Sequence, residues 1–333
     1  MKAQNNTFVT STSFNPWFNL ALEEFLLDNV TANEVILYLW QNKNTVVIGR
    51  NQNPWQECKI NKMSHEGVKL ARRLSGGGAV YHDLGNLNFT FIMRKELYDL
   101  KKQLTVILQA VNSFGLKAKF SGRNDLLLKG KKFSGNAYYF EDEAAYHHGT
   151  ILINSDLSKL SEYLQPSKEK IISKGIDSVK SRVINLHSVK REITVDKVKL
   201  SIFNCFEQLY GKTANSHKFT ENMATDHLLG ATFAPIYKKY SSWSWTYGES
   251  PAFDVSYEQR FSWGEIQIGL NLKNGYIHKV KIYSDALYTS FVDKLTAVLP
   301  GVKFKTQNIK QVISSLQPPE EEKQIYEDIL TLF

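Results

Sequence analysis

Hydrophobic and polar residues near the start of the chain follow a helical pattern. Asn15 can cap the free N–H groups of a helix and Pro16 suits its first position, ahead of the apolar run WFNLALEEFLL. Glu23 and Glu24 then predict the side of this helix that faces solvent. Apolar runs rich in β-branched and aromatic residues follow, and they predict strands at 35–40, 45–49, 68–73, 78–83 and 87–93.

Two further helices are predicted where apolar residues recur every three or four positions. The first spans 99–114 and ends at Gly115, and the second spans 194–210, between a capping Thr194 and Gly211. Between these helices the runs KAKF, DLLL, KFSGNAYYF and AAYHHGTILIN are separated by turn residues. This alternation of short apolar runs and turn residues is typical of antiparallel hairpins.

The pattern changes towards the C-terminus. Residues 243–251, WSWTYGESP, are turn-rich and typical of a junction between domains. Beyond them EIQIGLNL and YIHKVKIY alternate with period two around a turn at 273–275, and amphipathic stretches at 286–298 and 319–333 predict helices. We therefore predict an α+β protein with two domains. Residues 1–247 are expected to form a large domain with mixed, mainly antiparallel sheets flanked by helices, and residues 251–333 a small α+β domain.

Composition narrows the class of protein. Of the 333 residues, 42% are hydrophobic and 22% charged, which is ordinary for a soluble globular protein. No apolar run is long enough for a membrane span or a secretory signal, so we expect a cytoplasmic protein without a membrane partner. Cys58 and Cys205 lie far apart and suggest neither zinc nor a disulfide, and Cys205 lies on an apolar helical pattern that predicts burial.

The net charge of +8 favours anionic partners without choosing among them. The lysines are scattered and no DNA- or RNA-binding motif accompanies them, so we expect no nucleic-acid partner.

The segment RRLSGGGAVYHDLGN, residues 72–86, is the most informative for chemistry. Three consecutive glycines at 76–78 allow positive φ, let the backbone approach a ligand and leave N–H groups free to bind phosphate oxygens. Arg72 and Arg73 place guanidinium donors beside them. A glycine-rich hairpin turn with incidental basic residues beside it would have the same sequence pattern. The segment is not a Walker A loop, because no Gly-Lys-Ser/Thr follows, and not a Rossmann loop, because the spacing and the following helix are absent.

Two other segments carry candidate residues. In GRNDLLLKGKKFSGNAYYF, residues 122–140, Lys132 could hold a fixed positive charge beside Ser134 and Gly135, although lysines crowded in one turn are often simply solvated. In HHGTILIN, residues 147–154, His148 leads an apolar strand, where a histidine is more often a structural hydrogen-bonding group than a catalyst. No carboxylate or thiol lies at a spacing that predicts a triad.

Together these segments resemble the lipoate–protein ligase A family. The family's Arg-Arg-x-Ser-Gly-Gly-Gly-Ala-Val stands here at 72–80 and its lysine motif at 130–137. IGRNQNPW at 48–55, HGTILI at 148–153 and KGIDSVKSRVINL at 174–186 also match. The resemblance continues through WSWTYGESPAF at 243–253 into the C-terminal domain and so covers the whole chain. It implies that 1–247 is the catalytic domain that binds lipoate and ATP, and 251–333 an accessory domain. The departures are mild: Lys131 stands where arginine is frequent, and Phe133 where isoleucine or valine is usual.

The resemblance implies an ATP- and Mg²⁺-dependent enzyme. Lipoate would attack the α-phosphate of ATP to give lipoyl-AMP, and the lipoyl group would pass to a lysine of an acidic lipoyl-carrier domain, in E2 subunits of 2-oxoacid dehydrogenases or in H protein. Lys132 would be the catalytic residue, Asp125 would hold Mg²⁺, and we expect a monomer. By resemblance the nucleotide and lipoate contacts are Arg73, Ser75, Gly76, Gly77, Gly78, Val80, Tyr81, Asn124, Asp125, Ser134, Gly135, Ala137, His148, Gly149 and Thr150.

Three rival hypotheses remain at this point. A cysteine-dependent octanoyl- or lipoyl-transferase needs a thiol in a motif, and Cys58 and Cys205 lie outside every motif. A biotin–protein ligase has a different glycine-rich signature. A catalytically silent binding protein is disfavoured because Lys132 and the three glycines are intact.

Overall fold

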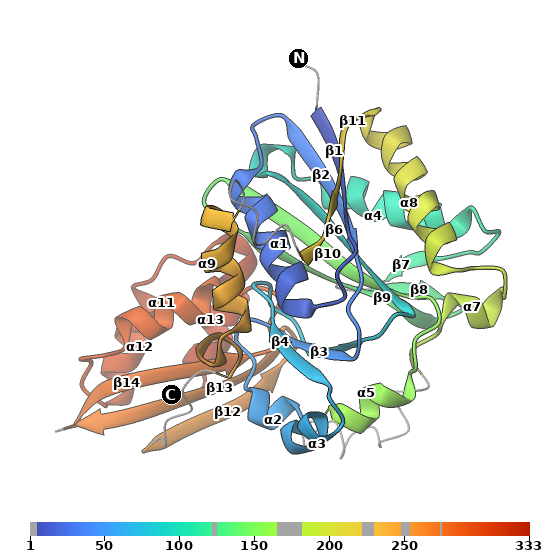
Figure 1. Ribbon diagram of the computed structural model, residues 1–333. Helices are drawn as coiled ribbons and strands as arrows, with labels where there is room; N and C mark the ends of the chain where they lie inside the picture. Colours follow the sequence, from blue (N-terminus) through green and yellow to red (C-terminus); the bar gives the residue numbers. More distant parts are fainter. Residues whose placement is uncertain (1–4, 122–124, 165–181, 222–229, 248–253, 274) are drawn as a thin grey trace. The chain divides into compact units, whose positions relative to one another are not determined.

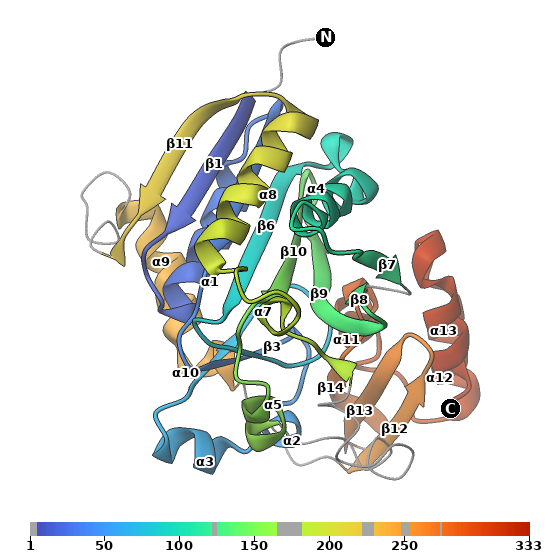
Figure 2. The ribbon, with the colours of Figure 1, turned by 90° about the vertical axis from the view of Figure 1, so that its right-hand side faces the viewer.

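The computed structural model describes residues 5–121, 125–164, 182–221, 230–247, 254–273 and 275–333 (Figures 1 and 2). The chain divides into two compact units. The first holds Met1–Val47, Trp55–Arg72 and Val80–Thr246, and the second combines Ile48–Pro54 and Arg73–Ala79 with Tyr247–Phe333. The C-terminal unit therefore includes two short segments from the N-terminal third of the chain. Our assignment of separate roles to residues 1–247 and 251–333 stays a prediction.

A large sheet forms the centre of the first unit. Among the described residues it has eight strands, ordered β11-β1-β2-β6-β10-β9-β8-β7. β1 runs parallel to both of its neighbours, whereas the other described pairs are antiparallel, so the predicted mixed, mainly antiparallel sheet is confirmed. The strands are β1 (Asn5–Ser11), β2 (Glu34–Trp40), β6 (Asn86–Arg94), β7 (Lys119–Ser121), β8 (Asp125–Leu128), β9 (Lys131–Phe140), β10 (Ala144–Leu152) and β11 (Thr213–Phe219).

Helices cover both faces of this sheet. α4 (Leu100–Asn112) and α8 (Val195–Tyr210) lie on one face, and α1 (Pro16–Asn29) and α9 (Gly230–Ser241) lie on the other (Figures 1 and 2). The face towards α4 and α8 is apolar, and from β6 it takes alternate residues such as Phe89 and Phe91, both fully buried. Asn88 and Thr90, which alternate with these residues on β6, are polar and equally buried, and they point to the opposite face because side chains alternate along a strand.

The helix ends follow the predicted capping. The Asn15 side chain accepts from the Trp17 N–H at the start of α1, and the Asp99 side chain accepts from the Lys102 N–H at the start of α4. Thr194 caps α8 in the same way through the Lys197 N–H. Gly115 and Gly211 follow α4 and α8 with φ of +76° and +97°, a region in which other residues are strained. These helix limits are confirmed.

Smaller elements complete the first unit. A three-stranded sheet has the order β4 (Lys69–Arg72), β3 (Thr45–Ile48) and β5 (Val80–His82). The short helices are α2 (Pro54–Glu57), α3 (Ile60–His65), η1 (Lys95–Leu97), α5 (Ser158–Tyr163), α7 (Leu186–Val189) and α10 (Trp243–Thr246). In the described part of the chain, no helix combines the length and the apolar character needed to cross a bilayer.

The second unit is a small α+β structure with its own core. β12 (Val255–Phe261), β13 (Gly264–Lys273) and β14 (Tyr276–Ser284) form an antiparallel sheet. α11 (Ser290–Val298), α12 (Thr306–Ser314), η5 (Glu320–Glu322) and α13 (Lys323–Leu330) follow it. The hairpin between β13 and β14 is confirmed, and its turn ends at Gly275 with φ of +77°. Its predicted Asn274 lies outside the described residues.

Several elements escaped prediction from the sequence. β1 and β11 carry many polar residues, and β11 is largely exposed as an edge strand. α9 contains Pro235, which normally ends a helix. β12 and α12 were missed as well, so the C-terminal unit has one strand and one helix more than the pattern indicated.

The two sides of α8 allow a test of this packing. Phe206 is fully buried, whereas Leu200 on the same helix is 61% exposed. We expect Phe206→Ala to lower the free energy of unfolding by about 3–5 kcal/mol through the cavity it leaves. Leu200→Ala should change it by less than about 0.5 kcal/mol. Denaturant unfolding of both variants measures the difference, and equal losses would contradict the assigned face.

Candidate active site

Lys132 lies where the β8–β9 hairpin is irregular. The pairing of β9 with β8 contains one extra residue at Phe133, which makes a β-bulge. Bulges re-aim side chains, and they are frequent beside active sites. Here Phe133 is fully buried in the core while the Lys132 side chain stays 36% exposed. The Lys132 Nζ lies 2.7 Å from Asp125 Oδ1, so a half-buried ion pair crosses the two strands.

A later segment fixes the backbone at the bulge. The Lys132 carbonyl accepts a hydrogen bond of 2.9 Å from the Ile184 N–H, and Val183 forms a parallel bridge to Lys132. Both residues belong to the motif at 174–186, of which 174–181 lie outside the described residues. The described part of this motif thus supports the strand that carries the lysine.

The glycine three residues after Lys132 leaves room for the lysine side chain. A Cβ at Gly135 would lie 2.9 Å from Lys132 Nζ, so the lysine folds over the position where a side chain would be. The Gly135 N–H lies 3.3 Å from Thr150 Oγ1 and donates to it. Asp125, Lys132, Gly135 and Thr150 are therefore brought together, as the sequence predicted for one site.

The same face of the sheet continues with buried polar residues. Thr150 pairs with Asn88 and His148 with Thr90 across β10 and β6, so these side chains share a face. Asn88 is 2% exposed, and its Nδ2 has no hydrogen-bond partner among the described residues. An unsatisfied buried group costs about 1–3 kcal/mol, which a polar ligand or water would offset. This face is suited to hold a polar molecule, and the polar residues alternating along 86–90 were a usable but overlooked pattern.

Glu23 corrects two of the predictions. It was expected to face solvent, but it is 2% exposed, because α1 packs this side against β6 and β10. Its Oε1 accepts from Thr90 Oγ1 at 2.6 Å and from His148 Nδ1 at 2.9 Å. His148 therefore does have a carboxylate partner, which lies 125 positions away and could not be detected from local spacing. Trp40 Nε1 extends the network by donating to Thr90 Oγ1 at 3.1 Å.

His147 lies on the opposite, apolar face and has a different environment. It is fully buried, with ring nitrogens 3.0 Å from Gln103 Oε1 and 3.0 Å from Asn136 Oδ1. Burial, with a smaller effect of His148, lowers its pKa from the ordinary 6.5 to about 3. The ring is neutral at physiological pH, so it donates through one nitrogen only and one of the two amides presents its NH₂ group.

Gly149 lies on the same apolar face as His147, where it pairs with Phe89. A Cβ there would come within 2.5 Å of the Phe89 ring and 2.8 Å of Asn136 Oδ1. Packing alone therefore requires glycine at this position.

The glycine loop belongs to the second unit and is built around Arg73. The guanidinium donates to Ser75 Oγ and to the carbonyls of Gly76 and Gly78, at 3.0, 2.6 and 2.8 Å. Gly77 has φ of +88°, as predicted for a glycine. Its N–H, however, donates to the Ala286 carbonyl at 2.9 Å, so the expectation that this group is left for phosphate is wrong.

The remaining predicted residues are placed as follows. Val80 is half-buried on β5, while Tyr81 is 7% exposed with its ring 5.7 Å from that of Tyr163, and burial raises its pKa to about 12. Ala137 pairs with His148 between β9 and β10. Ser134 is fully buried, and its hydroxyl has no hydrogen-bond partner in the described part of the chain. Asn124 lies outside the described residues.

The available ligand groups limit how this site could bind a metal ion. No group of three or more His, Cys, Asp or Glu side chains among the described residues could hold an ion. Asp125 offers one carboxylate, already paired with Lys132. Mg²⁺ commonly binds through one or two carboxylates together with waters and substrate phosphates. The site therefore fits a magnesium ion that arrives with a nucleotide, and not one held by the protein alone.

The first unit has a mixed sheet covered by helices on both faces, with the Lys132–Asp125 pair on its β8–β9 hairpin, and the second is a small α+β unit. Residues 15–207 match the family model of the lipoyl protein ligase A/B catalytic domain, and 250–333 match that of the bacterial lipoate protein ligase C-terminus. The first match alone covers more than half of the chain. The chain belongs to the lipoate–protein ligase family, as the motifs indicated.

Solved structures agree with this membership. The crystal structure of P. falciparum LipL1 in complex with lipoate shares 31% identity over 98% of this chain and 100% of its own, with a TM-score of 0.86. A bipartite lipoate protein ligase from Thermoplasma acidophilum, studied with its E2 lipoyl domain, shares 26% identity over 76% of this chain and 100% of its own, with a TM-score of 0.65. A lipoate-protein ligase A bound with ATP covers 74% of this chain and 99% of its own at 24% identity and a TM-score of 0.63, which shows the shared fold.

The neutral His147 predicts a pH dependence of stability. Between its folded pKa of about 3 and its ordinary value of 6.5, the unfolded chain binds a proton that the folded chain does not. Stability therefore rises with pH across this window and is lost as pH falls below 6.5, by about 1.4 kcal/mol per pH unit. We expect His147→Gln to remove this component. Urea unfolding at pH 7.5 and pH 5.5 measures it, and identical pH slopes for the two proteins would contradict the assignment.

Proposed function

We propose that this chain activates lipoate with ATP to form lipoyl-AMP, releases pyrophosphate, and transfers the lipoyl group to a lysine of a lipoyl-carrier domain. The carriers would be E2 subunits of 2-oxoacid dehydrogenases or the H protein of glycine cleavage. The single observation that carries the proposal is the Lys132–Asp125 pair folded over Gly135, at the edge of a polar, ligand-accepting face. Relatives with bound lipoate and with bound ATP support the two substrates.

In the activation step a lipoate carboxylate oxygen attacks the α-phosphorus of ATP. A new P–O bond forms as the bond to the leaving pyrophosphate breaks, and negative charge builds on the α-phosphate oxygens. The Lys132 ammonium would donate to these oxygens and to the lipoyl carbonyl, and Asp125 holds it in place beforehand. A preorganised donor of this kind is typically worth about 3–4 kcal/mol of transition-state stabilisation.

Each substrate has its own candidate surface. Lipoate fits the face that His148 and Thr150 share, where Glu23 fixes the histidine ring. The nucleotide would take the loop of Ser75 to Gly78, with Val80 towards the adenine. Mg²⁺, when bound with ATP, would neutralise phosphate charge next to Asp125.

In the transfer step the neutral amine of the carrier lysine attacks the lipoyl carbonyl. The amide bond forms, the bond to AMP breaks, and the amine loses a proton. Chemistry through an enzyme thiol is disfavoured because Cys58 and Cys205 are both buried. Burial raises the pKa of Cys58 to about 12 and also raises that of Cys205, so neither is a thiolate at neutral pH.

The lysine provides the first test of this proposal. Lys132→Ala should lower lipoate-dependent ATP–pyrophosphate exchange by about 100-fold or more, because one charged donor is lost. Lys131→Ala, which removes the exposed neighbouring lysine, should keep wild-type exchange. Circular dichroism would verify folding. A folded Lys132→Ala protein that keeps more than about a tenth of the exchange rate contradicts the proposal.

The glycine beneath the lysine provides a second test. In Gly135→Ala the added methyl group would displace the Lys132 ammonium, since its Cβ would lie 2.9 Å from Nζ. The flexible lysine end can move away, so stability should change little while the exchange rate falls by about tenfold or more. Melting temperature and exchange rate are measured on the same preparation. Full exchange would show that the position of the ammonium is not critical.

A further inference from the structure

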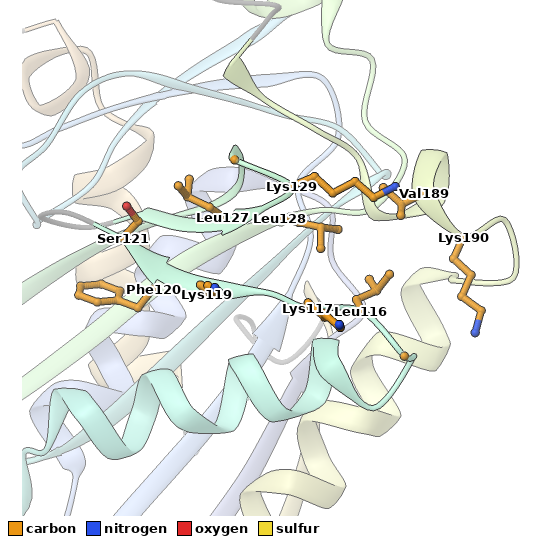
Figure 3. Close-up of a pocket in the computed structure, with 12 residues that line it drawn as sticks. Leu116, Lys117, Lys119, Phe120, Ser121, Leu127, Leu128, Lys129, Val189 and Lys190 are labelled. Carbon is orange, nitrogen blue, oxygen red and sulfur yellow. The ribbon is translucent and has the colours of Figure 1, made fainter.

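An open groove of about 940 Å³ lies at the tip of the β8–β9 hairpin (Figure 3). Three segments line it: 115–121 after α4, 127–130 in the hairpin, and 189–190 at the end of α7. All three belong to the first unit. The residues assigned above to lipoate and nucleotide do not line this groove, so it requires a separate explanation.

The groove is strongly basic. Lys117, Lys119 and Lys129 are exposed along it, and none of the described residues that line it is acidic. A fourth lysine, Lys190, contributes less, because its Nζ lies 3.0 Å from Glu192 Oε1 and also bonds the Phe114 carbonyl. The three other lysines give the groove a positive field that attracts an acidic surface.

Lys129 occupies a backbone conformation that is unfavourable for lysine. It has φ of +51° and Gly130 has φ of +75°, so both central residues of the two-residue turn have positive φ. Asparagine or aspartate before glycine is the usual solution for such a turn. Strained residues that persist are frequent at functional positions. Here the residue in the strained conformation is the one that places a positive charge at the hairpin tip.

Hydrogen bonds hold the segment after α4, and an exposed aromatic side chain lies at the groove. Asn112 fixes the segment after α4 by accepting from the Ala118 N–H at 2.7 Å and donating to the Ala118 carbonyl at 3.3 Å. Beyond it, Phe120 lies 44% exposed on β7, an edge strand of the sheet. Exposed aromatic residues within a charged rim are typical of protein–protein interfaces.

The groove also lies close to the reacting lysine of the enzyme. Leu127, which lines the groove, is the direct strand partner of Lys132. A domain seated in the groove would therefore contact β8, the strand paired with the one that carries Lys132.

From the basic groove, the strained Lys129 and the pairing with Lys132, we propose that this surface docks the acidic face of the lipoyl-carrier domain. The inference rests on the function proposed above. The alternative explanation is that Lys119 only prevents the exposed edge strand β7 from pairing with other chains. That explanation predicts no effect on the carrier.

A pair of charge reversals on opposite edges of the same sheet tests the proposal. Lys119→Glu alters the groove on β7, and Lys218→Glu makes the same change on β11, the other edge. Transfer from preformed lipoyl-AMP to a recombinant E2 lipoyl domain is measured at low and at physiological salt. We expect Lys119→Glu to raise the carrier KM about fivefold at low salt, with less effect at higher salt, and Lys218→Glu to leave it unchanged.

Lipoate-dependent pyrophosphate exchange separates the two proposals. Both variants should keep wild-type exchange, because neither lysine is assigned to the activation site. No exchange in the wild type would refute the proposed function, whereas normal exchange with equal carrier KM values in all three proteins would refute the groove alone.

Lys129→Asn gives a second and independent test. Asparagine tolerates positive φ better than lysine, so we expect the melting temperature to rise. The carrier KM should rise nonetheless, because the cation at the hairpin tip is lost. A more stable protein with an unchanged carrier KM would overturn the role of Lys129 in docking.

Discussion

The central strands of the large sheet have to bury both of their faces, because helices cover the sheet on each side (Figure 1). One face solves this with packed apolar side chains such as Phe89 and Phe91. The other carries Asn88 and Thr90 instead, and buried polar groups destabilise the fold unless they are hydrogen-bonded. Glu23 meets part of this demand by accepting from both Thr90 and His148. This polar face is only partly satisfied from within, because Asn88 Nδ2 has no hydrogen-bond partner among the described residues.

Lys132 is positioned by an irregularity of the backbone more than by the strength of its ion pair. A half-exposed pair such as Lys132–Asp125 typically contributes no more than about 1 kcal/mol to stability. The bulge at Phe133 is what separates a fully buried phenylalanine from a partly exposed lysine within two adjacent positions. Gly135 then leaves space for the lysine chain to reach Asp125. The bulge and the glycine together therefore determine the direction in which the Lys132 ammonium points.

Features of the fold and of the candidate site that depend on residues close together in the sequence could be predicted. Asn15, Thr194 and Gly211 mark helix ends through contacts within a few residues, and the motif around Lys132 identified the family. Contacts between distant residues gave no local indication: Glu23 looked like a solvent-facing residue because its partner His148 is 125 positions away. α9 was missed for a different reason, since Pro235 is a poor helix former whose position is tolerated once Phe233 packs in the interior. The alternation of Asn86, Asn88 and Thr90 was local and could have revealed the polar face.

The glycine loop shows why the two units cannot be treated as an enzyme with a removable appendage. Gly77 donates to the Ala286 carbonyl, and Ser284 donates to the Asn51 carbonyl, so both N-terminal segments of the second unit are hydrogen-bonded to its C-terminal part. A Cβ at Gly76 would come within 2.1 Å of the same Ala286 carbonyl. Glycine is therefore required at position 76 because its backbone lies close to the backbone of Ala286. A movement of residues 284–287 would therefore shift the loop or break its hydrogen bond to Ala286, because closely packed segments cannot be displaced independently. The C-terminal part of the chain thereby helps to set the conformation of a motif that lies more than 200 positions before it.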